Sequence, residues 1–195
     1  MAKVKTVIII LSITVSLFQF WGLCQAENIK EPADSGWEVI ESKYCTIHCH
    51  PDVNAKRVNG KIRIRFYDVV LDKSFYSQNN SIEKQLAEKF DRIFVKAEKI
   101  LDMYPRKIHL TIKIYKNQSQ LDDEYARIFK RSNRKRRISY YIHKYTTICT
   151  TERVIREGIL AHEMGHAICD HYFLIRPSEP VRELMAQYVE LHLED

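Results

Sequence analysis

Alternating apolar and polar positions mark the predicted β-strands of this chain. We expect strands over residues 37–50, 61–66, 108–114 and 138–150. Residues 61–66 and 108–114 place apolar side chains at every second position, a pattern typical of strands that bury one face. Residues 138–150 are rich in β-branched and aromatic side chains and contain neither Gly nor Pro. These four segments predict a small sheet.

Apolar side chains at helical spacing predict helices between and after these strands. We expect them over residues 82–103, 119–128, 151–168 and from Ser178, as N-cap, to Leu193. The first has an apolar residue at every third or fourth position from Leu86 to Leu101, and Pro105 follows its end. Pro180 falls in the first turn of the last helix, where its missing N–H has no cost.

The order of these elements predicts an α+β fold. Strands come first, then a long helix, more strands and two closing helices. We expect a small twisted mixed sheet with residues 82–103 as its backing helix. Residues 37–195 are long enough for one compact domain with a core of its own.

The N-terminus indicates export. Met1–Lys5 is basic, residues 6–23 are apolar, and small residues precede a cut after Ala26. Residues 1–26 therefore predict a secretory signal peptide, and the polar residues 27–36 a linker. The alternative is an uncleaved membrane anchor over residues 6–23, since that run approaches the length needed to span a bilayer. A cleaved signal predicts a periplasmic or secreted protein, and in both cases the domain lies outside the cytoplasm.

The formal net charge of +6 is concentrated in the run Lys130–Arg137. No aromatic residue interleaves this run as a base-stacking surface would require, and export argues against nucleic acid. We interpret it as a solvated loop. The alternatives are attraction of acidic substrates and association with a membrane surface.

Four cysteines remain after removal of the leader: Cys45, Cys49, Cys149 and Cys169. An exported domain can form disulfides, and Cys45 or Cys49 could pair with Cys149 from strand to strand. Cys45 and Cys49 cannot pair with each other on one extended strand, where they lie about 13 Å apart. Four free, buried thiols are the alternative. Their spacing does not match a cysteine-ligated metal site.

The segment His162-Glu163-Met164-Gly165-His166 carries the spacing H-E-x-x-H within a predicted helix. Histidines at i and i+4 share one helical face, so both imidazoles can reach one metal ion. Glu163 projects from the flank of that face, where it can take a proton from a water activated by the metal. Gly165 allows close packing beneath the metal. A catalytic zinc needs a third protein ligand and one open position.

Downstream, residues 183–190 read Glu-Leu-Met-Ala-Gln-Tyr-Val-Glu. From His162 to Glu190 the chain resembles the gluzincin metallopeptidases, the thermolysin and aminopeptidase N group of the peptidase MA-like superfamily. In that group H-E-x-x-H is followed, after a turn, by a helix with E-x-x-A and often a second Glu one heptad on. Glu183, Ala186 and Glu190 match those places. The residues after His166 lack the continuation of metzincins, and His171 lies off the ligand face.

This resemblance implies a zincin-like fold and a zinc-dependent peptidase. It implies one Zn²⁺ held by His162, His166 and Glu183, with Glu163 as general base and later proton donor to the leaving amine. Two other hypotheses belong to different classes. One is a catalytically weak or inactive zincin-fold protein at the cell envelope that binds metal or a partner. The other is a basic membrane-surface module without metal chemistry.

Other residues are candidates for supporting roles. In gluzincins a Tyr or His well downstream often stabilises the oxyanion. Here the candidates are Tyr188, His192, Tyr140, Tyr141, His143 and Tyr145. Asp170 and Glu190 are candidates to orient the ligands, with solvated surface carboxylates as the alternative.

The expected partner is a peptide or protein substrate. In zincins an edge strand before the metal helix pairs with extended substrate, and residues 138–150 are the candidate here. The alternative is an ordinary interior strand.

Overall fold

The computed structural model describes residues 36–66, 69–71, 81–132 and 135–195. The predicted leader of residues 1–26, its alternative as an anchor over residues 6–23, and residues 27–35 of the predicted linker lie outside the described residues. Within the described part of the chain, no helix is both long and apolar enough to cross a membrane.

Residues 36–195 form an α+β unit around one five-stranded mixed sheet. In chain order its elements are β1 (Glu38–Glu41), β2 (Cys45–Cys49), α2 (Ala55–Lys61), α3 (Ile82–Leu101), β3 (Leu110–Tyr115), α4 (Gln118–Phe129), β4 (Ser139–Ile142), β5 (Thr147–Thr151), α5 (Glu157–Tyr172) and α6 (Glu179–Leu191). A single 3₁₀ turn, His143–Tyr145, joins β4 to β5. The predicted α+β class is confirmed.

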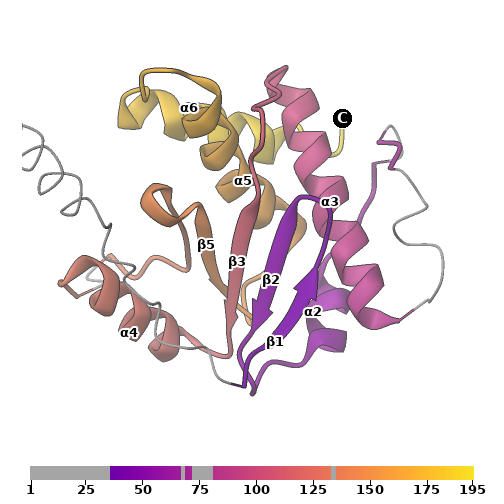
Figure 1. The fold of residues 1–195 in the computed structure, drawn as a ribbon, viewed down its shortest axis with the longest axis vertical. Coiled ribbons are helices and arrows are strands. Elements are labelled where there is room, and N and C mark those ends of the chain that lie inside the picture. The colour runs from indigo at the N-terminus through magenta and orange to yellow at the C-terminus, as the bar shows by residue number, and fades with distance from the viewer. Residues whose placement is uncertain (1–35, 67–68, 72–80, 133–134) are drawn as a thin grey trace, which may run out of the picture. The chain divides into compact units, whose positions relative to one another are not determined.

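The strand order in the sheet is β1-β2-β3-β5-β4 (Figure 1). The pairs β2/β3 and β3/β5 are parallel, and the two outer pairs are antiparallel. Helices α3 and α5 pack on one face, where Ile47, Ile112 and Ile148 enter the main core. Helix α4 covers the other face with a smaller cluster around Tyr125 and Tyr140. Successive side chains of a strand point to opposite faces of the sheet, and this alternation divides the side chains of the strands between the two cores.

Residues 37–50 form two strands instead of the single strand predicted. The turn between β1 and β2 is held by the fully buried Asp91 of α3. The carboxylate of Asp91 accepts hydrogen bonds from the Ser42 hydroxyl at 2.8 Å and from the backbone N–H groups of Lys43 and Tyr44 at 2.9 and 3.0 Å. Asp91, which is 47 or more residues away in the chain, therefore stabilises this turn. The turn itself contains no Gly or Pro from which it could have been predicted.

The prediction of a strand over residues 61–66 is wrong. Asn54 caps α2 by accepting a hydrogen bond from the Arg57 N–H, and α2 ends at Lys61. The following residues are not in the sheet. The Arg63 N–H donates to the Glu157 carboxylate at 3.2 Å, and Ile62 and Phe66 are buried in the main core. The apolar alternation thus reports burial of every other side chain, without strand pairing.

The prediction of one strand over residues 138–150 is also wrong, because this segment is a hairpin. The 3₁₀ turn ends at Thr146, whose φ of 49° is in the left-handed region, and the Thr146 N–H donates to the His143 carbonyl. A β-branched residue is rare in that conformation, so the sequence contains no turn signal there. As a result β4 lies at the edge of the sheet and β5 lies in its interior.

The remaining helices were predicted with shifted ends. Helix α5 begins at Glu157 instead of residue 151, because Thr151 still belongs to β5 and Glu152 turns into the interior. Helix α4 is capped by Asn117 instead of Ser119. Helices α3 and α6 start where predicted, with Ser81 and Ser178 at their N-cap positions.

All four described cysteines are free and buried. Of the two alternatives that the sequence left open, the structure has the four free, buried thiols and not the pairing of Cys45 or Cys49 with Cys149. Cys45 and Cys49 face the main core, whereas Cys149 faces the smaller cluster under α4, on the opposite side of the sheet. Side chains on opposite faces of a sheet point apart, so their sulfur atoms cannot bond without moving the backbone.

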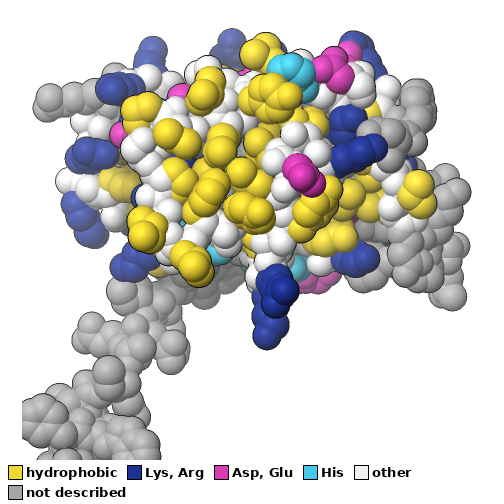
Figure 2. Space-filling model, turned by 90° about the horizontal axis from the view of Figure 1, so that it is seen from above, with side chains coloured by type: hydrophobic (Ala, Val, Ile, Leu, Met, Phe, Trp, Pro, Cys, Tyr) yellow, Lys and Arg dark blue, Asp and Glu magenta, His cyan; other side chains and the backbone are white. Residues whose placement is uncertain are grey.

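Apolar side chains gather on the outer surface of α6 and of the α5–α6 connection. Figure 2, which views the molecule from above, shows such a cluster on this side. The exposed residues that form it are Leu174, Ile175, Val181, Leu184, Tyr188 and Leu191. A contiguous group of this kind is typical of a surface that contacts another molecule, and we call it the α6 apolar face.

Candidate metal centre

Close packing of α5 against α6 creates the candidate metal site. A Cβ atom on Gly165 would lie 3.0 Å from the Ala186 Cα atom and 3.3 Å from the Val189 Cγ2 atom. Only a residue without a side chain permits this approach. The contact places Glu183, one turn before Ala186, opposite the two histidines of α5.

The side chains of His162, His166 and Glu183 converge. Their candidate ligand atoms all lie within 4.8 Å of one another. The Nε2 atom of His162 is 3.7 Å from one Glu183 carboxylate oxygen, and the Nε2 atom of His166 is 3.4 Å from the other. In a tetrahedral zinc site with bonds of about 2.0–2.2 Å, ligand atoms lie about 3.3–3.5 Å apart. The two His–Glu distances are close to this range, so the three side chains fit the donor set of a zinc ion.

The far sides of the two imidazoles differ. The Nδ1 atom of His162 contacts the Glu190 carboxylate at 3.2 Å, which leaves Nε2 turned toward Glu183. The Nδ1 atom of His166 is buried and has no hydrogen-bond partner among the described residues. Burial, together with repulsion from His162, lowers the pKa of His166 to about 4. His166 is therefore neutral at physiological pH, which is the form that binds a metal.

Glu163 lies beside this group, buried between α5 and β4 with 6% of its surface exposed. Its carboxylate accepts hydrogen bonds from the Ser139 hydroxyl and the Tyr141 backbone N–H. Burial, and next the charges of Glu183 and Glu190, raise its pKa to about 8. The Ser139 hydroxyl also lies 3.2 Å from the Cys149 carbonyl, so its single proton is shared between two acceptors.

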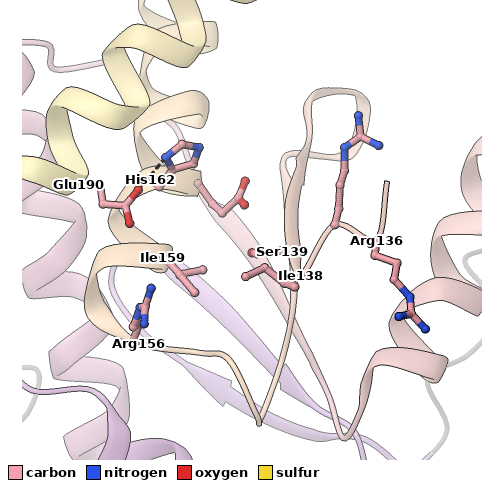
Figure 3. A pocket seen from close by; sticks show the side chains of 9 residues that line it. Arg136, Ile138, Ser139, Arg156, Ile159, His162 and Glu190 are labelled. Carbon is pink, nitrogen blue, oxygen red and sulfur yellow. Dashed lines mark hydrogen bonds and ion pairs between the residues drawn. The ribbon is translucent and has the colours of Figure 1, made fainter. Parts of the chain in front are cut away.

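A cleft of about 470 Å³ opens beside His162 and Glu163 (Figure 3). Its lining residues are Arg136, Arg137, Ile138, Ser139, Arg156, Ile159, His162, Glu163 and Glu190. Ile138 and Ile159 point toward each other across it, from the strand side and from α5 (Figure 3). The cleft is large enough for a few residues of a peptide next to the candidate metal ligands.

The predicted oxyanion donors lie elsewhere. The cleft lining, as far as the chain is described, includes none of these six side chains. Tyr188 packs against His192 on α6 with ring centroids 4.0 Å apart, and the Tyr140 hydroxyl donates to the Leu121 carbonyl. Tyr141 contributes its backbone N–H to Glu163. His143 pairs with Asp170 at 3.3 Å, and Tyr145 is exposed.

Of the two candidates for orienting residues, Glu190 contacts a predicted ligand directly and Asp170 does not. The Asp170 carboxylate is fully buried and lies 2.7 Å from Arg176 and 3.6 Å from Arg182. It therefore joins the end of α5 to the α5–α6 connection and to α6. His171 lies off the ligand face, with its Nε2 atom 3.4 Å from the Thr146 hydroxyl.

Sequence reasoning missed Ser139 and Arg156 as parts of the site. A signal existed for Arg156, because it precedes Ile159 by three residues and His162 by six, so all three share one side of α5. No comparable signal existed for Ser139, since its place depends on how β4 pairs at the sheet edge. Comparison with protein-family models, curated proteins and solved structures finds no match to this chain.

Proposed function

We propose that this protein is a zinc-dependent peptidase of the gluzincin type with a zincin-like arrangement of its α+β fold. The observation that carries the proposal is the convergence of His162, His166 and Glu183 within 4.8 Å. A buried carboxylate, Glu163, lies next to them on a cleft. A general base beside three ligands is the constellation of metal-assisted hydrolysis.

His162, His166 and Glu183 hold one Zn²⁺, and Glu190 keeps His162 oriented through its Nδ1 atom. When bound, the ion would supply a water of lowered pKa and would polarise the carbonyl of the scissile peptide bond. Glu163 accepts the proton of the attacking water and returns it to the leaving amine. Ser139 and the Tyr141 N–H fix the carboxylate of Glu163 in place for both transfers.

The substrate is an extended segment of a peptide or protein. Strand β4 is the edge of the sheet and borders the cleft through Ser139. An edge strand has unpaired backbone groups that can add one more strand. We therefore narrow the expected binding segment from residues 138–150 to β4 and the residue before it. A location outside the cytoplasm, as the N-terminal pattern predicts, makes envelope or extracellular peptides the accessible substrates.

The test compares the full-length chain with Glu163→Gln, which keeps the shape of the side chain and removes the acceptor of the proton. We expect one zinc per chain in both proteins and a loss of hydrolysis of about 10²–10⁴-fold in the variant. Zinc content is measured by elemental analysis, and hydrolysis with an unstructured protein substrate. Equal, slow cleavage by both proteins with zinc present would show that Glu163 is not the base.

The ligand assignment has its own test. Glu183→Ala should lose zinc to a chelator at least tenfold more readily than the wild type. Glu179→Ala is the matched control, since it removes an exposed glutamate one turn earlier on the same helix. If Glu183→Ala and Glu179→Ala retained zinc equally, Glu183 would not be a ligand.

A metal-binding interaction protein without hydrolytic activity is the second candidate function. The α6 apolar face favours it, because this surface lies on the helix that carries Glu183 and is too apolar to be explained by scattered surface residues. The Glu163→Gln comparison separates the two candidates, since a site that only binds metal or a partner does not need the carboxylate of Glu163.

A further inference from the structure

The two walls of the cleft present the same order of side chains away from the metal ligands. On α5, His162 and Glu163 are preceded by Ile159 and then by Arg156, the N-cap residue of the helix, at intervals of three or four residues. These positions share one side of the helix. The wall of the cleft that α5 and its N-cap residue form thus presents the candidate catalytic residue Glu163, then the apolar Ile159 and then the cationic Arg156.

The opposite wall repeats this order. Ser139, which bonds to Glu163, is preceded by Ile138 and then by Arg137 and Arg136. Ile138 and Ile159 face each other across the cleft, and Arg156 lies beyond Ile159 (Figure 3). The cleft therefore has an apolar neck between its catalytic end and an outer end lined by guanidinium groups.

The outer end carries exposed positive charge at Arg136 and Arg156. Neither forms an ion pair with any described residue. Arg137 donates a hydrogen bond to the Tyr125 hydroxyl at 3.2 Å. The two carboxylates in the described lining, Glu163 and Glu190, both belong to the metal end. Arg137 also lines a neighbouring cavity of about 660 Å³, whose described lining holds Arg131, Lys135 and one carboxylate, Glu179.

We infer that the cleft selects peptides bearing a carboxylate two or three residues from the scissile bond, with an apolar side chain between the two. This inference rests on the proposed peptidase function. A guanidinium group binds a carboxylate through charge-assisted, often bidentate hydrogen bonds, which a neutral amide cannot match. The carboxylate belongs to an Asp or Glu side chain or to the C-terminus of the substrate.

The position of the carboxylate follows from the spacing of the α5 wall. Six residues of helix rise about 9 Å, which separates the level of Arg156 from that of His162. An extended peptide advances about 3.4 Å per residue, so the same distance corresponds to two or three residues. Ile159 lies halfway between them and contacts the intervening side chain.

The experiment uses the full-length protein with zinc and a set of matched fluorogenic peptides. Glu, Gln or Lys is placed at each of three positions on either side of the bond, and the C-terminus is a free acid or an amide. We expect the value of kcat/KM for Glu to exceed that for Gln by about tenfold, at positions two or three from the bond, and Lys to be worst. An advantage confined to free-acid peptides identifies the C-terminal carboxylate as the group recognised.

The arginines are tested through the ratio of Glu to Gln peptides. Arg156→Gln and Arg136→Gln should each reduce this ratio severalfold. Arg153→Gln is the matched control, since Arg153 is an exposed arginine near the start of α5 that does not line the cleft. Raising the salt concentration from 0.1 to 1 M should also reduce the ratio, because the screening length falls from about 10 to about 3 Å.

Binding provides a second readout. Glu163→Gln should bind the Glu peptide at least fivefold more tightly than the Gln peptide, as measured by fluorescence anisotropy. Cleavage of all peptides at equal rates would overturn the acidic preference and leave the peptidase proposal intact. Failure to cleave any peptide, together with Arg156-dependent binding of the Glu peptide, would refute the peptidase and retain the selectivity of the cleft. Equal binding of the Glu, Gln and Lys peptides would overturn the inference.

Discussion

Gly165 offers the sharpest test of how α5 and α6, the helices that carry the candidate metal ligands, meet. In Gly165→Ala a methyl group is placed 3.0 Å from the Ala186 Cα atom and 3.3 Å from the Val189 Cγ2 atom. Carbon atoms in contact prefer separations of about 3.5–4.0 Å. The backbone of α6 therefore has to move away by about 0.5 Å, since Ala186 cannot avoid the methyl group by rotating a side chain.

Two opposing terms determine the stability of this variant. Alanine is favoured over glycine in a helix by about 0.8–1 kcal/mol. Overpacking in a well-packed core costs about 1–3 kcal/mol. The expected net change is a loss of about 0–2 kcal/mol in the free energy of unfolding. The effect on zinc should be larger, because a movement of about 0.5 Å exceeds the tolerance of about 0.2 Å in metal–ligand distances. We expect zinc affinity to fall by about 10–100-fold.

Two other glycines provide matched controls. A Cβ atom on Gly60, in α2, meets nothing within 4 Å, and one on Gly158, in α5, makes only ordinary contacts of 3.6 Å with Glu190. Gly60→Ala should raise the free energy of unfolding by up to about 1 kcal/mol and leave zinc affinity unchanged. Gly158→Ala tests whether substitution within α5 alone disturbs the site.

The measurements are urea unfolding of the metal-free chain and competition for zinc with a chromophoric chelator. If Gly165→Ala gained as much stability as Gly60→Ala and bound zinc as tightly as the wild type, the close approach of α5 and α6 would be refuted. The assignment of Glu183 by this packing would then fail with it.

Two predictions concern buried carboxylates outside the site. Burial raises the pKa of Glu98 on α3 to about 7, above its unfolded value of about 4.3, so ionised Glu98 disfavours the folded state. Its contribution to stability is complete below the unfolded pKa and is lost as pH rises through 7. In urea unfolding, the stability of Glu98→Gln relative to the wild type should therefore increase from pH 5 to pH 8, by up to about 3 kcal/mol. A difference in the free energy of unfolding that did not change with pH would refute this. Glu152 behaves in the opposite way: burial alone would raise its pKa, but hydrogen bonds from the Asn54 N–H at 2.9 Å and from Lys116 at 2.9 Å hold the pKa below its ordinary value. The contribution of Glu152 to stability is present above its unfolded pKa and is lost as pH falls. Glu152→Gln should therefore lower the free energy of unfolding by about 1–3 kcal/mol at pH 7 and by much less near pH 3. The same loss at both pH values would contradict this.

The sequence by itself determined the elements whose signals are local. The backing helix predicted over residues 82–103, which the structure has as Ile82–Leu101, follows from apolar spacing, because that pattern acts within a few residues. The common face of His162 and His166 follows from the helical repeat. The match of Glu183 and Glu190 to a family pattern then placed the candidate site on α6, and this was an argument from resemblance, since 17 residues separate Glu183 from His166.

Tertiary structure decided what depends on partners distant in the chain. The turn of residues 42–44 is made by Asp91, and the hairpin of β4 and β5 contains no turn residue that a pattern could detect. The apolar residues that alternate over residues 62–66 are those that the core buries. This segment differs from a strand only because no neighbouring strand among the described residues pairs with it. The two walls of the cleft come from segments about 20 residues apart that the sheet and α5 bring face to face. A local pattern specifies which side chains avoid water, but long-range packing determines what each of them meets, because that choice depends on the free energy of the whole folded core.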